Sequence, residues 1–152
     1  MIIFQELLQN KVLISALAGW CIAQVLKTII HLFFTKKFVA ERLVGSGGMP
    51  SSHSATVCAL STSALIVYGI GSFEFAISFI LAVIVMHDAM GVRRETGIQA
   101  KVLNELIEVF AAMDSDMSAQ EKLKEFVGHT PLQVLVGALL GITIAILVCI
   151  ML

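Results

Sequence analysis

The sequence predicts an all-α fold, an integral membrane bundle of about four transmembrane helices with one or two amphipathic helices on the cytoplasmic side. Two observations support this prediction. Of the 152 residues, 58% are hydrophobic and only 14% are charged, whereas about 25% of the residues in a soluble domain are charged. Four apolar stretches also approach the roughly 20 residues that a spanning helix requires. We therefore expect a single membrane domain over residues 1–152, surrounded by a lipid bilayer.

The four predicted spans differ in how clearly the apolar pattern defines them. They cover residues 12–34, 54–73, 75–92 and 131–152. The second and the fourth contain no charged side chain. The first is interrupted by Lys27 and His31, and the third is apolar until His87 and Asp88. A tight turn at residues 69–72 is expected to join the second span to the third.

The segment 93–130, between the third and fourth spans, has a different character. Its apolar residues recur at helical spacing with charged residues between them, which indicates an amphipathic helix lying in the membrane interface or packed on the bundle. Ser118 and Glu121 then form a capping box for a second short helix. The apolar positions are Ile98, Val102, Leu103, Leu106, Ile107, Val109, Phe110 and Met113 in the first helix, and Leu123, Phe126 and Val127 in the second.

The basic residues predict the orientation of the bundle. The loops at 35–53 and 93–130 hold eight of the ten Lys and Arg residues, and such an excess marks cytoplasmic loops. We expect both loops to face the cytoplasm and both termini to lie outside. The net charge of -1 offers no basic patch to a nucleic acid. The N-terminal stretch lacks the pattern of a cleaved signal peptide, which favours the inner membrane of a bacterium.

Polar side chains gather at the cytoplasmic ends of all four predicted spans. Because polar groups inside a membrane are costly, such a gathering suggests a functional site. The four groups are Lys27 and His31; Ser51, Ser52 and His53; His87, Asp88, Arg93 and Arg94; and His129, Thr130 and Gln133.

The stretch 45–56, GSGGMPSSHSAT, is typical of an anion site. Its glycines, Gly48 among them, allow backbone N–H groups to turn toward one point. Pro50 suits the first position of a helix that Ser51 or Ser52 caps, and the positive end of that helix favours an anion. His53 should lie one turn into the helix, where it can donate a proton. The cations expected to clamp a bound phosphate are Lys27, Arg93 and Arg94.

Three motifs resemble those of a known superfamily. MPSSHSA resembles the PSGH-type motif of the type-2 phosphatidic acid phosphatase and vanadium haloperoxidase superfamily, and GHTPLQVLVGALLG resembles the segment that carries its nucleophilic histidine. HDAMGVRRETGIQAKVLN looks like the divergent, small membrane branch of the superfamily. The resemblance implies hydrolysis of a phosphate monoester or pyrophosphate without a metal or other cofactor.

The resemblance also implies a role for each site residue. His129 is expected to attack phosphorus and form a phosphohistidine, and His53 to protonate the departing oxygen. The equatorial oxygens would be stabilised by Lys27, Arg93, Arg94 and the backbone of residues 48–52.

The sequence departs from the superfamily pattern in three places. Lys27 lacks the Arg that follows seven residues after the first motif's Lys, and Lys122 and Leu123 stand where a Ser-Arg pair is expected. Gln133 replaces the Asp expected four residues after the nucleophile. Gln133 can orient the imidazole but cannot stabilise its positive charge, and Asp88 is expected to supply that charge across the bundle.

Three classes of function are compatible with these residues. The first is a phosphatase acting on a lipid phosphate or polyprenyl pyrophosphate at the cytoplasmic leaflet, and the second is a lipid-phosphate binding or transport protein without turnover. The third is a metal site built from His53, His87, Asp88 and His129, which the surrounding cations disfavour. Structural interpretations are also open for these polar residues: Lys27 could snorkel to the head groups, His31 and His87 could lie at the interface, Asp88 and an arginine could form a structural pair, and Asn104 could lie on an exposed helix face. A homodimer is expected if one bundle cannot bury the polar end.

Overall fold

The computed structural model describes residues 2–36, 45, 48–113, 123 and 128–152, and these contain helices and no β-strand. The predicted all-α membrane bundle is confirmed. The helices are α1 (Ile2–Gln9), α2 (Lys11–Thr35), α3 (Ser52–Tyr68), α4 (Phe73–Met90), α5 (Val92–Met113) and α6 (Pro131–Met151).

Within the described residues, three helical segments are long and apolar enough to cross a membrane: α2, the segment Phe73–Phe110 that begins with α4, and α6. The remaining predicted span corresponds to α3, which ends at Tyr68 and not at residue 73. With 17 residues, α3 lies at the lower limit of about 17 for a spanning helix. The predicted number of four spans is therefore approximate. The turn predicted at residues 69–72 is present, because Ser72 caps α4 and Gly69 has a φ of 86°.

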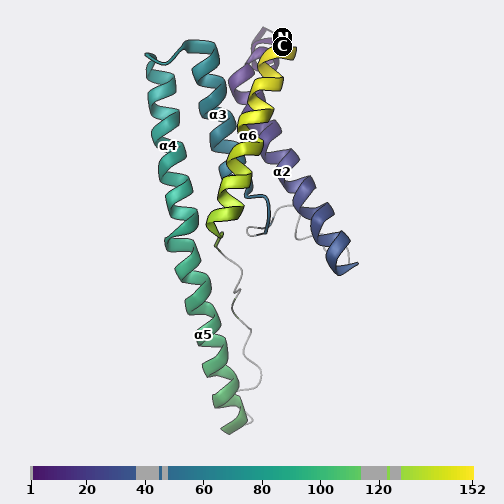
Figure 1. Ribbon diagram of the computed structural model, residues 1–152, viewed down its shortest axis with the longest axis vertical. Coiled ribbons are helices and arrows are strands. Elements are labelled where there is room, and N and C mark those ends of the chain that lie inside the picture. The colour runs from purple at the N-terminus through teal and green to yellow at the C-terminus, as the bar shows by residue number, and fades with distance from the viewer. Residues whose placement is uncertain (1, 37–44, 46–47, 114–122, 124–127) are drawn as a thin grey trace.

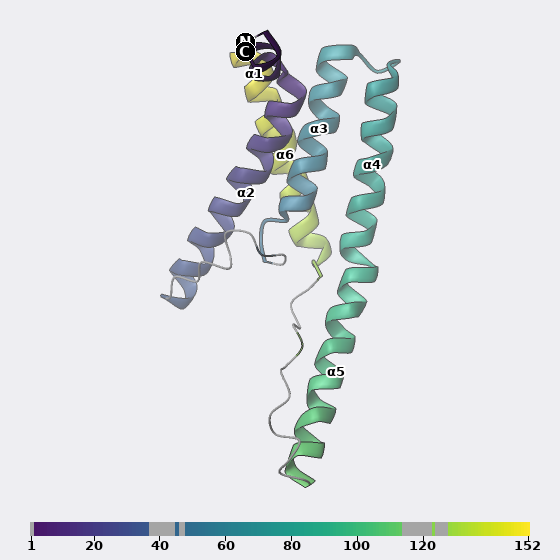
Figure 2. The same cartoon turned by 180° about the vertical axis from the view of Figure 1, so that it is seen from behind.

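The central helix is α3, which packs against α2, α4 and α6. α2 and α6 also pack together, whereas α2 and α4, both described over their whole lengths, do not contact each other. Figure 2 shows the result, with α3 visible between α2 and α4. One side of α3 therefore faces an opening between two neighbouring helices.

Small residues at four-residue spacing bring the three inner helices close together. Gly19 on α2 faces Ala55 and Ala59 on α3, where an added Cβ would lie 2.9 Å from the Ala55 oxygen. Gly137 and Gly141 on α6 face the backbone oxygens of Ser51 and Ala55, so closely that a Cβ at either glycine would overlap with them. Such stripes allow helix backbones to approach in a membrane, where packing replaces the hydrophobic effect as the driving force.

The helix α5 continues α4 beyond the end of the bundle (Figure 1). Of the α5 positions whose burial is described, Gly97, Ala100 and Asn104 are buried. The predicted apolar face does not pack on the bundle, because residues such as Ile98 and Leu106 are each 47% exposed. Placement of this face in the membrane interface stays a prediction. The predicted second short helix, from Ser118 to Val127, lies outside the described residues except for Leu123, which is not in a helix.

Both chain termini lie at one end of the bundle, and the starts of α3 and α6 lie at the other (Figure 1). The predicted common side for the termini agrees with this arrangement. That the opposite end faces the cytoplasm stays a prediction.

Candidate functional site

The site is built on the starts of two parallel helices. α3 begins after Ser51, whose hydroxyl accepts a hydrogen bond from the N–H of Ser54. α6 begins after Thr130, which forms a capping box with Gln133. The Ser51 N–H donates to the backbone carbonyl oxygen of Gln133 at 3.1 Å, so the two helix starts are joined directly. Both positive helix ends thus point to the same region, which favours an anion there.

The start of α3 corrects two details of the prediction. Because Ser51 is the cap, α3 begins at Ser52, and Pro50 lies before the cap instead of at the first helical position. His53 is consequently the second residue of α3 and not one turn into it. Gly48 has a φ of 82°, in the left-handed region that favours glycine.

His129 is buried and is positioned by two elements, the end of α4 and the start of α6. Its side chain is almost completely enclosed, and its backbone N–H donates to the Ala89 carbonyl at the end of α4, at 3.1 Å. Its Nδ1 lies 3.3 Å from Oε1 of Gln133. The same oxygen accepts the Thr130 N–H at 3.0 Å, which identifies it as the carbonyl end of the amide. Since a carbonyl only accepts, Nδ1 carries the proton and Nε2 has the lone pair in the neutral ring.

The two histidines of the site lie next to each other. The ring centroids of His53 and His129 are 6.0 Å apart, with an angle of 62° between the ring planes. His53 comes from the first turn of α3, and His129 comes from the residue before the cap of α6. Because Ser51 and Gln133 join these two helix starts, the separation of the rings is set by rigid elements.

The third member of the site is Lys27, which points into the bundle. It is 2% exposed, so it does not snorkel to the head groups. Its ammonium donates to Gln24 Oε1 at 2.7 Å, to the Gly45 carbonyl at 3.2 Å and to the Ser52 hydroxyl at 3.4 Å. These bonds connect α2, residue 45 and the start of α3, and they place a buried positive charge at Ser52, the residue before His53.

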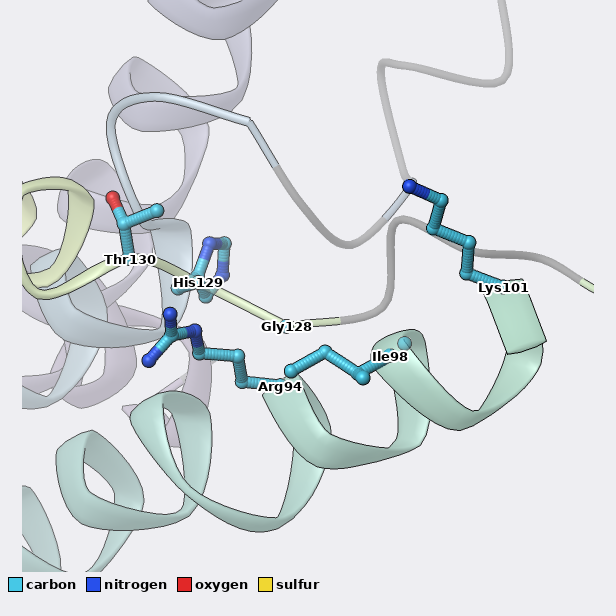
Figure 3. A pocket seen from close by; sticks show the side chains of 7 residues that line it. Arg94, Ile98, Lys101, Gly128, His129 and Thr130 are labelled. Carbon is cyan, nitrogen blue, oxygen red and sulfur yellow. The ribbon is translucent and has the colours of Figure 1, made fainter.

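A pocket of about 310 Å³ opens beside His129 and is lined by α5 and by the segment before α6. In Figure 3 the Arg94 side chain extends from α5 toward His129 and Thr130. Lys101, two turns further along α5, lines the same pocket. Asp88 is half-buried in the last turn of α4, next to Ala89. The side chain of Arg93 lies outside the described residues.

The structure therefore brings most of the predicted site residues to one end of the bundle. Lys27, Ser51, Ser52, His53, His129 and Gln133 are linked by the contacts above, and Arg94 lines the adjoining pocket. Gly48 precedes this group in the loop. The metal alternative is not supported by the described residues, because no three His, Cys, Asp or Glu side chains among them lie close enough to hold an ion.

The roles of Gln24 and Asn104 were not among those predicted from the sequence. Gln24 lies three residues before Lys27, one helical turn away, and that spacing is the signal for its contact with the ammonium. Asn104 is 4% exposed, which contradicts its interpretation as a residue on an exposed face. Its amide pairs with both backbone groups of Leu123 at 2.9 Å each, and so holds Leu123 against α5.

The fold and the site define a helical membrane protein with two histidines and a buried lysine at one end of its bundle. A model of the Divergent PAP2 family matches residues 8–144, and the chain belongs to that family. This confirms the resemblance drawn from the three motifs. The chain is also 45% identical over 150 residues to the "Uncharacterized membrane protein YuiD" of Bacillus subtilis (strain 168), covering 93% of this chain and 95% of the relative. No solved structure matches the chain.

Proposed function

We propose that the protein is a membrane-embedded phosphatase that hydrolyses a lipid phosphate or polyprenyl pyrophosphate through a phosphohistidine, at an end of the bundle that faces the cytoplasm. The observation that carries the proposal is the pair of imidazoles, His53 and His129, 6.0 Å apart at two joined helix starts. One phosphoryl group between the rings can contact both of them. The buried Lys27 and the two positive helix ends supply the charge that such a group requires.

In the first step, Nε2 of His129 attacks the terminal phosphorus, and the bond from phosphorus to the ester oxygen of a lipid phosphate, or to the bridging oxygen of a pyrophosphate, breaks. The side-chain carbonyl of Gln133 supports this role, because it fixes the proton of the His129 ring on Nδ1 and leaves the lone pair on Nε2. His53 donates a proton to the departing oxygen. In the second step, water attacks the phosphohistidine, His53 takes a proton from that water, and inorganic phosphate leaves.

The cations stabilise the transferred group in both steps. Lys27 acts at the Ser52 side of the site, and Arg94 acts from the pocket on α5. Asp88 lies in the α4 turn whose Ala89 carbonyl binds the His129 backbone. We assign Asp88 the stabilisation of the positive charge that forms on the His129 ring, the task that the neutral Gln133 cannot perform. The hydrocarbon part of the substrate remains in the membrane between the helices.

Phosphate release by the purified protein in lipid nanodiscs tests the proposal. The substrates are phosphatidate, phosphatidylglycerol phosphate and a polyprenyl pyrophosphate. His129→Ala and His53→Ala are expected to abolish release while the unfolding temperature stays close to that of the native chain. His87→Ala is the matched control, because His87 is exposed on α4. Release by His129→Ala at the native rate would refute the phosphohistidine.

A second function is favoured by one observation, the neutral amide at position 133. A site without a carboxylate next to the imidazole can bind phosphate without turnover, as a lipid-phosphate carrier or regulatory protein does. Gln133→Glu keeps the length of the side chain and adds the negative charge. Binding of vanadate together with release only in Gln133→Glu would establish the binding function and reject the native chain as an enzyme.

A further inference from the structure

A second site lies at the end of the bundle that carries the chain termini, opposite His53 and His129. A hollow of about 470 Å³ runs between α2 and α4, with α3 as its floor. Its apolar lining includes Val12, Leu13, Leu60, Ala64, Ile77 and Leu81.

The hollow exists because α2 and α4 flank α3 without touching each other over their described lengths. α3 contributes Leu60, Ala64 and Tyr68 to the lining, and of these Ala64 is almost completely buried. Figure 2 looks onto this side of the bundle. In a bilayer the hollow opens toward lipid, and an apolar lining offers water too few partners for hydrogen bonds. Hydrocarbon is therefore the occupant that its chemistry favours.

The rim of this hollow is polar and charged. A neighbouring hollow of about 390 Å³ shares Asn10, Val12 and Tyr68 with it and adds Glu6 and Lys11. Glu74, in the first turn of α4, lines the rim of the larger hollow. Neither Glu6 nor Glu74 forms a salt bridge within the described part of the chain. The Lys11 ammonium donates to the Cys149 carbonyl at 3.5 Å.

The charges on the rim select a head group. Among the described side chains that line the two hollows, two carboxylates outnumber the single ammonium, so a purely anionic head group would be repelled by the rim. A head group with both a phosphate and an amine matches it, with the phosphate toward Lys11 and the amine toward the carboxylates. The apolar hollow below then takes an acyl chain.

We infer that this end of the bundle binds a zwitterionic phospholipid with a primary amine in its head group, one acyl chain lying between α2 and α4 on the floor of α3. The site is separate from the proposed phosphatase site, because the two lie at opposite ends of the bundle. It does not depend on turnover at His129.

The test is lipid selection in nanodiscs that contain equal amounts of phosphatidylethanolamine and phosphatidylglycerol with the same acyl chains. Native mass spectrometry of the released protein should show phosphatidylethanolamine retained in preference to phosphatidylglycerol. The double variant Glu6→Gln, Glu74→Gln should lose about tenfold in this preference, the effect of removing a charge-assisted hydrogen bond. Glu95→Gln, on α5, is the matched control and should retain the preference. Equal retention of both lipids, or a preference that survives the double variant, would overturn the inference.

A second variant tests the hydrocarbon part of the site. Ala64→Phe fills the floor of the hollow and should reduce the retained lipid, whereas Ala76→Phe, an exposed position on α4, should not. If Ala64→Phe does not fold, the glutamate variants decide alone. Phosphate release should be unchanged in the double glutamate variant. A rise in KM for a lipid phosphate in Ala64→Phe, without any loss of retained phosphatidylethanolamine, would show that the substrate tail fills the hollow and would overturn the inference.

Discussion

The substitution Gly137→Ala tests whether the close approach of α3 and α6 holds the site together. Gly137 lies on α6, about two turns after the α6 cap Thr130, and it faces the backbone of Ser51. An added Cβ would overlap with the Ser51 carbonyl oxygen and would lie 3.1 Å from both the Ser51 nitrogen and its Cβ. Since two of these three atoms belong to the backbone, no side-chain rotation can relieve the contact.

Two opposing effects determine how much Gly137→Ala changes the stability of the folded protein. Replacing Gly by Ala inside a helix favours the folded helix by about 1 kcal/mol. Overpacking against a rigid neighbour costs about 1–3 kcal/mol. Because Gly137 meets backbone within overlap distance, we expect the upper part of that range, and a net loss of about 1–2 kcal/mol in stability. To relieve the overlap, the start of α3 must move away from α6. This movement separates the Ser51 N–H from the Gln133 backbone carbonyl, so phosphate binding should weaken as well.

The assay is thermal unfolding in detergent, followed by circular dichroism and combined with vanadate binding. Gly71→Ala is the matched control, because a Cβ at Gly71 meets nothing within 4 Å. A Gly137→Ala protein that is more stable than the native chain by about 1 kcal/mol would show helix propensity acting alone. That result would refute the close packing of α3 and α6.

Three further substitutions test other contacts of the site. Gln133→Leu removes the oxygen shared by the Thr130 N–H and His129, and should cost about 1–2 kcal/mol in thermal unfolding and lower phosphate release. Asn104→Leu removes both bonds to Leu123 and should accelerate hydrogen exchange at the Leu123 amide, measured by mass spectrometry. Lys27→Met keeps the length of the side chain but removes the buried ammonium, so titration calorimetry should show vanadate affinity lowered by at least about tenfold. An unchanged affinity in Lys27→Met would exclude this lysine from the anion site.

The arrangement of the helices was largely predictable because hydropathy and length decide it. The turn after Tyr68 and the cap before α6 follow from local residues, and the first and last spans agree with α2 and α6 to within one residue at each end. The start of α3 was harder to predict, because Pro50 and Ser51 both suit a helix start and only packing against Gln133 selects the serine as the cap.

The site was predictable where neighbouring residues share a helix start, and not where distant chain segments meet. Gln133 stands four residues after His129, so a contact between them follows from spacing. The direction of Lys27 does not, since a lysine near a helix end can reach either the head groups or the interior. No pattern in the sequence around Asn104 indicates that its partner is the backbone of Leu123, 19 residues away.

The bonds of Lys27 have a consequence for the order in which the protein is assembled. Two of its acceptors, at Gly45 and Ser52, follow α2 in the chain and are synthesised after it. An isolated α2 supplies Gln24 as an acceptor but lacks those at Gly45 and Ser52, so in the membrane it must keep this ammonium near water. The charge can move inward only when α3 docks against α2, as the second of two stages in membrane folding. The protein thus acquires the positive charge of its site by helix association and not by insertion.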